Sequence, residues 1–255
     1  MWGGSLIGTL ASGYLVDLWG FRANFHIGGI FMLLGGGMIA LSPGRSGARD
    51  RRRRRGRRGS WTLAISPGLV LVSLMGFMRL LVEQGVVGTI LPIYARDYLH
   101  LDVALIGTLM AVRSVGYIAI TVLAGFLSDR VGRRPVLLTG LAVIGLSVFL
   151  LSAAGALQLL VPLMFLLGSG SGMVWSVLPV LVSELTDPSV RGLAMGVFRT
   201  AFDVGGIIGP ILITTVFDYL GVHHCFYIGA ALILMNLPLV LPLRKRLLFT
   251  AQNTR

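Results

Sequence analysis

The chain has 255 residues, of which 55% are apolar and 13% are charged, and its mean hydropathy is +0.85. A soluble domain carries about a quarter charged residues, so this composition excludes an ordinary soluble enzyme, a disordered protein and a secreted disulfide scaffold. Lys and Arg total 22 against 10 Asp and Glu, and Cys225 is the one cysteine, which allows no intrachain disulfide and no cysteine metal cluster. The composition predicts a polytopic membrane protein.

Eight apolar segments approach the length of a membrane span, which is about 20 residues. They are Met1–Val16, Phe25–Leu41, Pro67–Tyr94, Val103–Leu127, Val136–Ala154, Leu159–Val182, Val190–Phe217 and Cys225–Leu243. The first is short and lacks the basic flank of a signal peptide, so we do not interpret it as one. The expected fold class is therefore an all-α membrane protein with eight transmembrane helices.

A polar segment, Ser42–Ser60, separates the first two spans from the other six. It is rich in Gly, Ser and Arg, has no apolar periodicity and is typical of a linker. Its arginine run, Arg51–Arg55, resembles a nucleic-acid patch, but no aromatic residue is interleaved for base stacking, which favours a topological role near anionic lipid. We expect two spans in residues 1–42, this basic linker in 43–61, a six-helix unit in 62–243 and a tail in 244–255.

The distribution of Lys and Arg predicts the orientation of the spans. Seventeen of them lie in the linker, in Asp129–Arg134, at Arg191 and in the tail, whereas the opposite connections hold two, Arg22 and Arg96. Because positive residues accumulate on the cytoplasmic side, we expect the linker and the C-terminus in the cytoplasm of a multi-pass cell-membrane protein.

A shift of 201 residues aligns the first two spans with the last two without a gap. The shift pairs Gly4 with Gly205, Gly8 with Gly209, Asp17 with Asp218, Gly20 with Gly221 and Phe25 with Phe226. This match predicts a structural repeat, the usual construction of secondary transporters. If so, residues 62–243 form a complete six-helix half, and roughly 140 further residues are expected before Met1.

The segment from Gly125 to Arg134 contains Gly-x-x-x-Asp-Arg-x-Gly-Arg-Arg, with the fixed residues Gly125, Asp129, Arg130, Gly132, Arg133 and Arg134. This segment resembles the signature cytoplasmic loop of the major facilitator superfamily, whose members have two six-helix halves. The resemblance implies a transporter fold without its first four helices and part of the fifth, with this loop between helices eight and nine.

Two spans also resemble the antiporter motif of that family, Gly-x-x-x-Gly-Pro-x-x-Gly-Gly. The seventh span has Gly205, Gly209 and Pro210 at the first three positions, with Ile213 and Thr214 in place of the last glycines, and the first span has Gly4 and Gly8. We expect these glycines to serve close helix packing.

The chemistry of the loop from Gly125 to Arg134 is compatible with a gate. Gly125 would let two helices approach, Gly132 would permit a tight turn, and Asp129 would cap a neighbouring helix. The three arginines would pair with acidic groups or lipid phosphate and release them in another state. The alternative is a basic turn that only sets topology.

Five charged residues lie deep inside the expected spans: Arg79, Glu83, Arg113, Arg199 and Asp203. Charges at such depth are costly, so we expect them to line a central cavity or to pair between helices, with Glu83 or Asp203 as a proton carrier. The alternative for Arg79 and Glu83, one helical turn apart, is a closed pair that only fixes helix rotation.

Two functional hypotheses follow. The first is a secondary transporter that moves a small organic solute by alternating access, with proton-coupled efflux and without a cofactor, a metal site or an enzymatic centre. The second is a non-transporting membrane remnant that associates with other membrane proteins. The sequence leaves the solute and the oligomeric state open, and Trp2, Trp19, Trp61 and Trp175 are given no special role.

Overall fold

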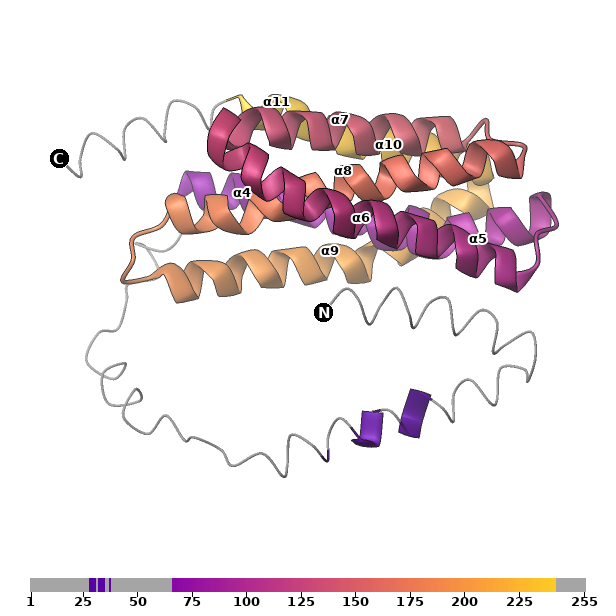
Figure 1. The fold of residues 1–255 in the computed structure, drawn as a ribbon, viewed down its shortest axis with the longest axis horizontal. Helices are drawn as coiled ribbons and strands as arrows, with labels where there is room; N and C mark the ends of the chain where they lie inside the picture. Colours follow the sequence, from indigo (N-terminus) through magenta and orange to yellow (C-terminus); the bar gives the residue numbers. More distant parts are fainter. Residues whose placement is uncertain (1–27, 31, 35–36, 38–65, 242–255) are drawn as a thin grey trace.

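The computed structural model describes residues 28–30, 32–34, 37 and 66–241. Within residues 66–241, six helices are long and apolar enough to cross a membrane, which confirms the expected all-α fold of a multi-pass membrane protein. The helices lie along the long axis of the molecule (Figure 1). The first expected span, most of the second, the linker, the tail, Gly4 and Gly8 lie outside the described residues.

Each of these six helices begins and ends within four residues of the bounds expected from the sequence. The first spanning helix joins α4 (Pro67–Val82), the π-helical η1 (Glu83–Ile90), α5 (Leu91–Ile93) and the π-helical η2 (Tyr94–Tyr98). It is followed by α6 (Val103–Val131), α7 (Arg133–Leu151), α8 (Leu157–Glu184) and α9 (Arg191–Leu220). The last span combines α10 (Val222–Leu234) and α11 (Asn236–Val240).

Local chemistry explains where several helices begin and end. The Ser66 hydroxyl accepts a hydrogen bond of 3.1 Å from the Leu69 N–H, and Pro67 starts α4 at a position where no backbone donor is needed. Gly132 and Gly221 have φ angles of 102° and 84°, which favour glycine, and each separates two spanning helices alone.

Two expected turns are more helical than the sequence indicated. The predicted turn at Asp129–Arg134 was wrong in extent, because α6 continues to Val131 and α7 begins at Arg133, so that Gly132 alone reverses the chain. The connection expected to hold Arg96 also begins later in the chain, because Arg96 lies near the end of η2.

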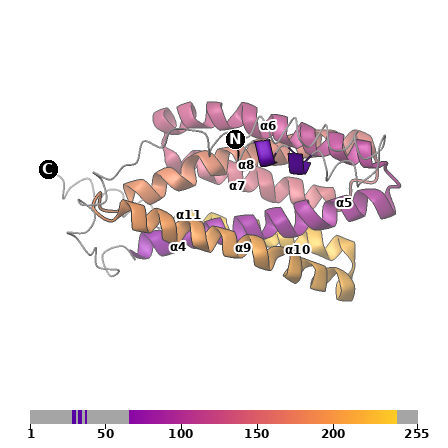
Figure 2. The same cartoon turned by 90° about the horizontal axis from the view of Figure 1, so that it is seen from below.

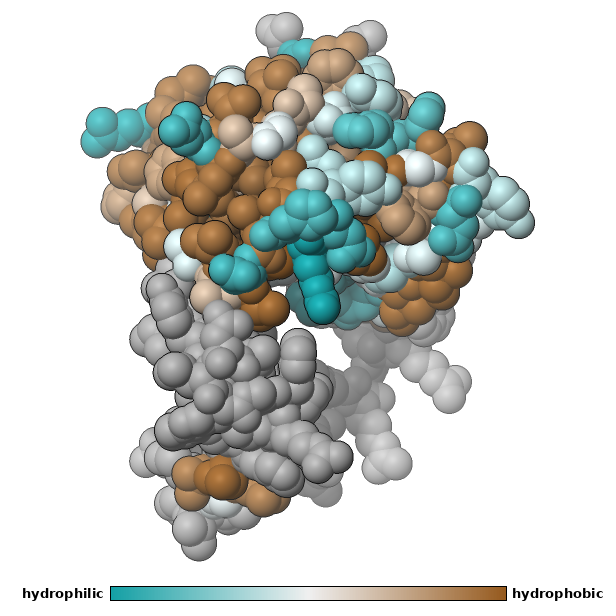
Figure 3. Space-filling model, turned by 90° about the vertical axis from the view of Figure 1, so that its right-hand side faces the viewer, coloured by the Kyte–Doolittle hydropathy of each residue, from teal (hydrophilic) through white to brown (hydrophobic). Residues whose placement is uncertain are grey.

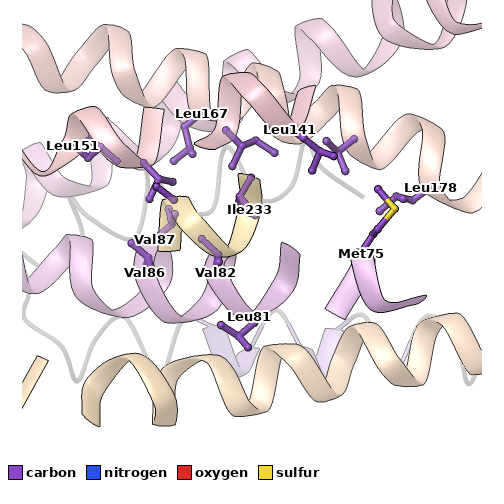
Figure 4. Close-up of a cluster of buried hydrophobic side chains, with 14 of the residues drawn as sticks. Met75, Leu81, Val82, Val86, Val87, Leu141, Leu151, Leu167, Leu178 and Ile233 are labelled. Atoms are coloured by element: carbon purple, nitrogen blue, oxygen red, sulfur yellow. The ribbon is translucent and has the colours of Figure 1, made fainter. Parts of the chain in front are cut away.

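The helices pack around α4 and α8. Helix α6 lies against α8, α8 against α7, α7 against α10, and α9 lies along α4 and η1 (Figures 1 and 2). Figure 4 shows the apolar side chains between them, including Val82, Val86 and Ile233, which are at most 1% exposed. Many apolar side chains on the outer surface, such as Phe126 and Ile207, are instead exposed, and brown apolar residues cover much of the face in Figure 3.

Two glycines of α9 allow it to approach α4 closely. A Cβ on Gly205 or Gly209 of α9 would overlap the backbone carbonyl oxygens of Phe77 and Leu81 of α4, respectively. Gly205 and Gly209 thus lie where α9 contacts α4, and Pro210 follows inside α9. Small residues permit this contact because they leave the facing backbones free of side chains.

We predict that Gly205→Ala lowers the stability of the protein by about 1–3 kcal/mol, because the added methyl group would push α9 away from α4. Gly196→Ala is the matched control on the same helix, since a Cβ there would meet no heavy atom of the described residues within 4 Å. The control should be neutral or stabilising, since alanine is the better helix former.

Thermal unfolding in detergent, followed by loss of the monodisperse peak in size-exclusion chromatography, measures both variants. Equal melting of Gly205→Ala and Gly196→Ala would contradict the packing argument.

Candidate functional site

A cavity of about 410 Å³ lies among α4, η1, α6, α8 and α9. The structure brings all five charged residues from deep inside the expected spans to this cavity. Its lining consists of Arg79, Leu80, Glu83, Gln84, Arg113, Tyr117, Trp175, Arg199, Phe202 and Asp203. At 1.5 Å per residue, Glu83 lies about 24 Å from the start of α4, so the cavity is deep within the helices.

Glu83 lies between two arginines from different helices. An Nη atom of Arg113 on α6 forms an ion pair with Oε1 of Glu83, and Nη2 of Arg79 lies 3.7 Å from Oε2. The hydroxyl of Ser171 on α8 donates a hydrogen bond of 3.4 Å to the same Oε2. The pair of Arg79 and Glu83 is therefore not closed on itself, and three helices meet at one carboxylate.

Aromatic rings surround the more buried arginine. The side chain of Arg79 is 6% exposed, and its guanidinium carbon lies 5.9 Å from the ring centroids of both Trp175 and Phe202. The two rings lie 5.3 Å apart. Because the face of an aromatic ring carries negative charge, the rings stabilise a cation that the single Glu83 carboxylate does not fully neutralise.

A second ion pair lies on the open side of the cavity. Nε of Arg199 donates a hydrogen bond of 3.0 Å to Oδ2 of Asp203, one turn along α9, and both side chains are more than half exposed. The guanidinium of Arg199 also lies 5.3 Å from the centroid of the Phe202 ring. This pair is thus more accessible than the pair of Arg113 and Glu83.

Local backbone features position these charges. A Cβ on Gly168 or Gly172 of α8 would overlap the carbonyl oxygen of Arg113 or Tyr117, so α6 lies close against α8 where its cavity residues project. Directly after α4, the π-helical stretch η1 begins at Glu83. A π turn changes the angular positions of the side chains that follow it, and such turns are frequent at functional sites.

Sequence reasoning missed several residues of the site. Trp175, which was given no special role, lines the cavity beside Arg79, together with Phe202, Tyr117 and Gln84. Aromatic residues are also common in helix packing, so their spacing alone does not reveal a cavity. A signal did exist for Phe202, which directly precedes Asp203 in the chain.

The segment from Gly125 to Arg134 forms a separate polar cluster at the junction of α6 and α7. Arg133 forms an ion pair with Asp129, donates a hydrogen bond of 2.8 Å to the Ser128 hydroxyl, and lies 3.2 Å from Oε1 of Glu184 at the end of α8. One guanidinium thereby connects the ends of three helices.

Other expectations for this segment do not hold among the described residues. Asp129 does not cap α7, whose first residue follows Gly132 without a side-chain cap, because Asp129 faces Arg133 instead. A Cβ on Gly125 would meet nothing within 4 Å in the described part of the chain, so no close helix approach occurs there. Arg130 and Arg134 form no ion pair within residues 66–241.

A family comparison identifies this arrangement. The model of the Major Facilitator Superfamily matches residues 72–251, which is more than half of the chain. The chain belongs to the Major Facilitator Superfamily. The resemblance that the signature loop predicted is thereby confirmed, and the six described helices correspond to a part of the fold of this superfamily.

Relatives within the superfamily include a multidrug resistance protein, MdtG, of Dickeya zeae (strain Ech586), which is 27% identical over 92% of this chain and 58% of its own length. The multidrug efflux pump LfrA of Mycolicibacterium smegmatis is 31% identical over 64% of this chain and 31% of its own length. This chain therefore spans less than two thirds of these relatives.

The human organic anion transporter MFSD10 (TETRAN) has a similar fold. The TM-score is 0.55 at 20% sequence identity, and the match covers 68% of this chain and 40% of that one. A likeness at this identity concerns the fold alone.

We predict that Arg133 and Glu184 are energetically coupled by about 0.5–1 kcal/mol, the range for a partly exposed ion pair. A double-mutant cycle with Arg133→Gln, Glu184→Gln and the double variant measures the coupling through thermal stability in detergent. Glu184 with Arg191 is the matched control, because this exposed arginine forms no ion pair within residues 66–241. Additive effects of Arg133→Gln and Glu184→Gln would show that the contact contributes nothing.

Proposed function

We propose that this chain carries out secondary transport of a small organic solute by alternating access, as proton-coupled efflux across a cell membrane. The observation that carries the proposal is the cavity with five charged residues deep within the helices. Ionisable residues inside a membrane protein mark solute and ion pathways because their burial is costly. The names of two relatives, a multidrug resistance protein and a multidrug efflux pump, support efflux as the direction.

The two ion pairs of the cavity have different proposed roles. Glu83 has three partners, Arg79, Arg113 and Ser171, and we assign it to the solute site, where it contacts both inner arginines. Asp203 pairs with Arg199 alone among the described residues and is half exposed, so we assign it the proton. A proton on Asp203 would remove the charge that holds Arg199 and would change the charge of the cavity between two states.

We further propose that the cluster around Arg133 acts as a gate on the cytoplasmic side, where the linker and the C-terminus would also lie. Arg133 contacts residues at the ends of α6 and α8. Charged contacts of this kind are broken when helices separate and are formed again when they return, so they favour one conformation of a transporter.

We predict that Asp203→Asn abolishes solute movement without preventing membrane insertion, because the amide cannot carry the proton. The full chain is reconstituted into liposomes with an acidic interior, and uptake of two dyes, the cation ethidium and the anion fluorescein, is measured by fluorescence. The expected result is accumulation of at least one dye, lost with a protonophore. Asp203→Asn and Arg113→Gln should both reduce it to the level of empty liposomes.

Asp218→Asn is the matched control, because Asp218 is exposed near the far end of the same helix and does not line the cavity. It should transport normally. Movement of neither dye by the natural chain, or equal transport by Asp203→Asn and Asp218→Asn, would contradict the proposed function.

A further inference from the structure

We infer that the solute bound in this cavity is an organic anion with an aromatic body, whose acidic group lies between Arg79 and Arg113. This inference rests on the proposed function, since it names the class of solute for the same cavity. It concerns binding, and it is therefore testable apart from transport.

The charge of the cavity is the first argument. Arg79, Arg113 and Arg199 face only two carboxylates, Glu83 and Asp203, so one positive charge is in excess among the lining residues. The excess belongs to the inner part of the cavity, because Arg199 and Asp203 pair with each other. An uncompensated charge inside a membrane protein is costly, and an anion that enters the cavity would neutralise it.

The hydrogen bonds of the two inner arginines are the second argument. Nε of Arg79 and Nε of Arg113 are both buried, and neither has a hydrogen-bond partner among the described residues. Arg79 is 5% exposed as a whole residue. A guanidinium has five N–H donors arranged to bind carboxylate or phosphate with two hydrogen bonds, so these groups retain donors that an acidic solute would satisfy.

The remaining lining explains the aromatic body. The rings of Trp175 and Phe202 lie beside the Arg79 guanidinium and 5.3 Å from each other. They offer a flat apolar surface next to the place where the acidic group would bind. A volume of about 410 Å³ is within the usual range for small-molecule sites, roughly 300–1,000 Å³.

Glu83 has a specific role in this arrangement. Its carboxylate already contacts both Arg79 and Arg113, so it competes with an acidic solute for the same guanidinium groups. Removal of its charge should strengthen anion binding. A purely structural ion pair predicts the reverse, because the loss of Glu83 would leave two arginines unpaired and disturb the site.

The experiment compares three probes with the same rings and different charges: 2-naphthoate, 2-naphthalenemethanol and 2-naphthylmethylammonium. Binding to the full chain in an uncharged detergent is measured by equilibrium dialysis against protein-free micelles. We expect 2-naphthoate to bind at least about tenfold more tightly than either of the other probes, as one charge-assisted contact would provide.

Variants then locate the site. Arg113→Gln should lose about tenfold in affinity for 2-naphthoate, Arg113→Lys should retain much of it, and Glu83→Gln should gain several-fold. The control is Arg191→Gln, which removes an exposed arginine of α9 outside the cavity and should change nothing. Unchanged binding of 2-naphthalenemethanol and a monodisperse elution profile verify that each variant is folded.

Equal affinity for the three probes would overturn the inference, and so would weaker binding of 2-naphthoate by a folded Glu83→Gln variant. If Arg113→Gln and Arg113→Lys do not fold, the Glu83→Gln variant and the comparison of the three probes still test whether the cavity binds an anion. Dye transport without a preference for 2-naphthoate would leave the proposed function standing and refute the anion site. Arginine-dependent binding of 2-naphthoate without dye transport would support the anion site and refute the proposed transport function.

Discussion

The ion pair between Arg113 and Glu83 constrains the rest of the structure. It joins α6 to the long first helix inside an apolar bundle, and Ser171 of α8 completes the contact. Charges at this depth are tolerated only when partners lie within reach, so the helices must meet in one rotation and at one height. The cavity lies directly beside this ion pair, and both of its residues line it.

Glycines of α8 and α9 let the helices that carry Arg113 and Glu83 pack closely enough for these two residues to meet. Gly168 and Gly172 of α8 lie against the carbonyl groups of Arg113 and Tyr117, and Gly205 of α9 lies against that of Phe77, two residues before Arg79. The small residues therefore occur where the charged side chains project. Close backbone contact limits how far α6 can slide along α8, which keeps the guanidinium of Arg113 at the carboxylate.

The sequence was sufficient for the six spans within residues 66–241 because about 20 consecutive apolar residues leave few alternatives. It also identified the five charges of the cavity, since any ionisable residue inside a span is unusual. The sequence could not show which of these charged residues form ion pairs with one another. Arg113 has no acidic neighbour on its own helix, and its partner depends on the rotation of α6 against α4, which tertiary packing decides. The position of Trp175 in the cavity likewise depends on how the helices are rotated against one another, so the sequence did not reveal it. No residue pattern indicated that a π-helical stretch begins at Glu83.

The difference between the two ion pairs indicates how such a bundle would change state. The inner pair of Arg113 and Glu83 is held by three helices, whereas Arg199 and Asp203 share one helix and are more than half exposed. Packed interiors resist continuous deformation, so a conformational change proceeds most easily as movement of whole helices with their close contacts intact. The groups free to exchange partners are then the exposed ones. By this argument we propose that the inner pair determines what is bound and that the outer pair responds to protonation.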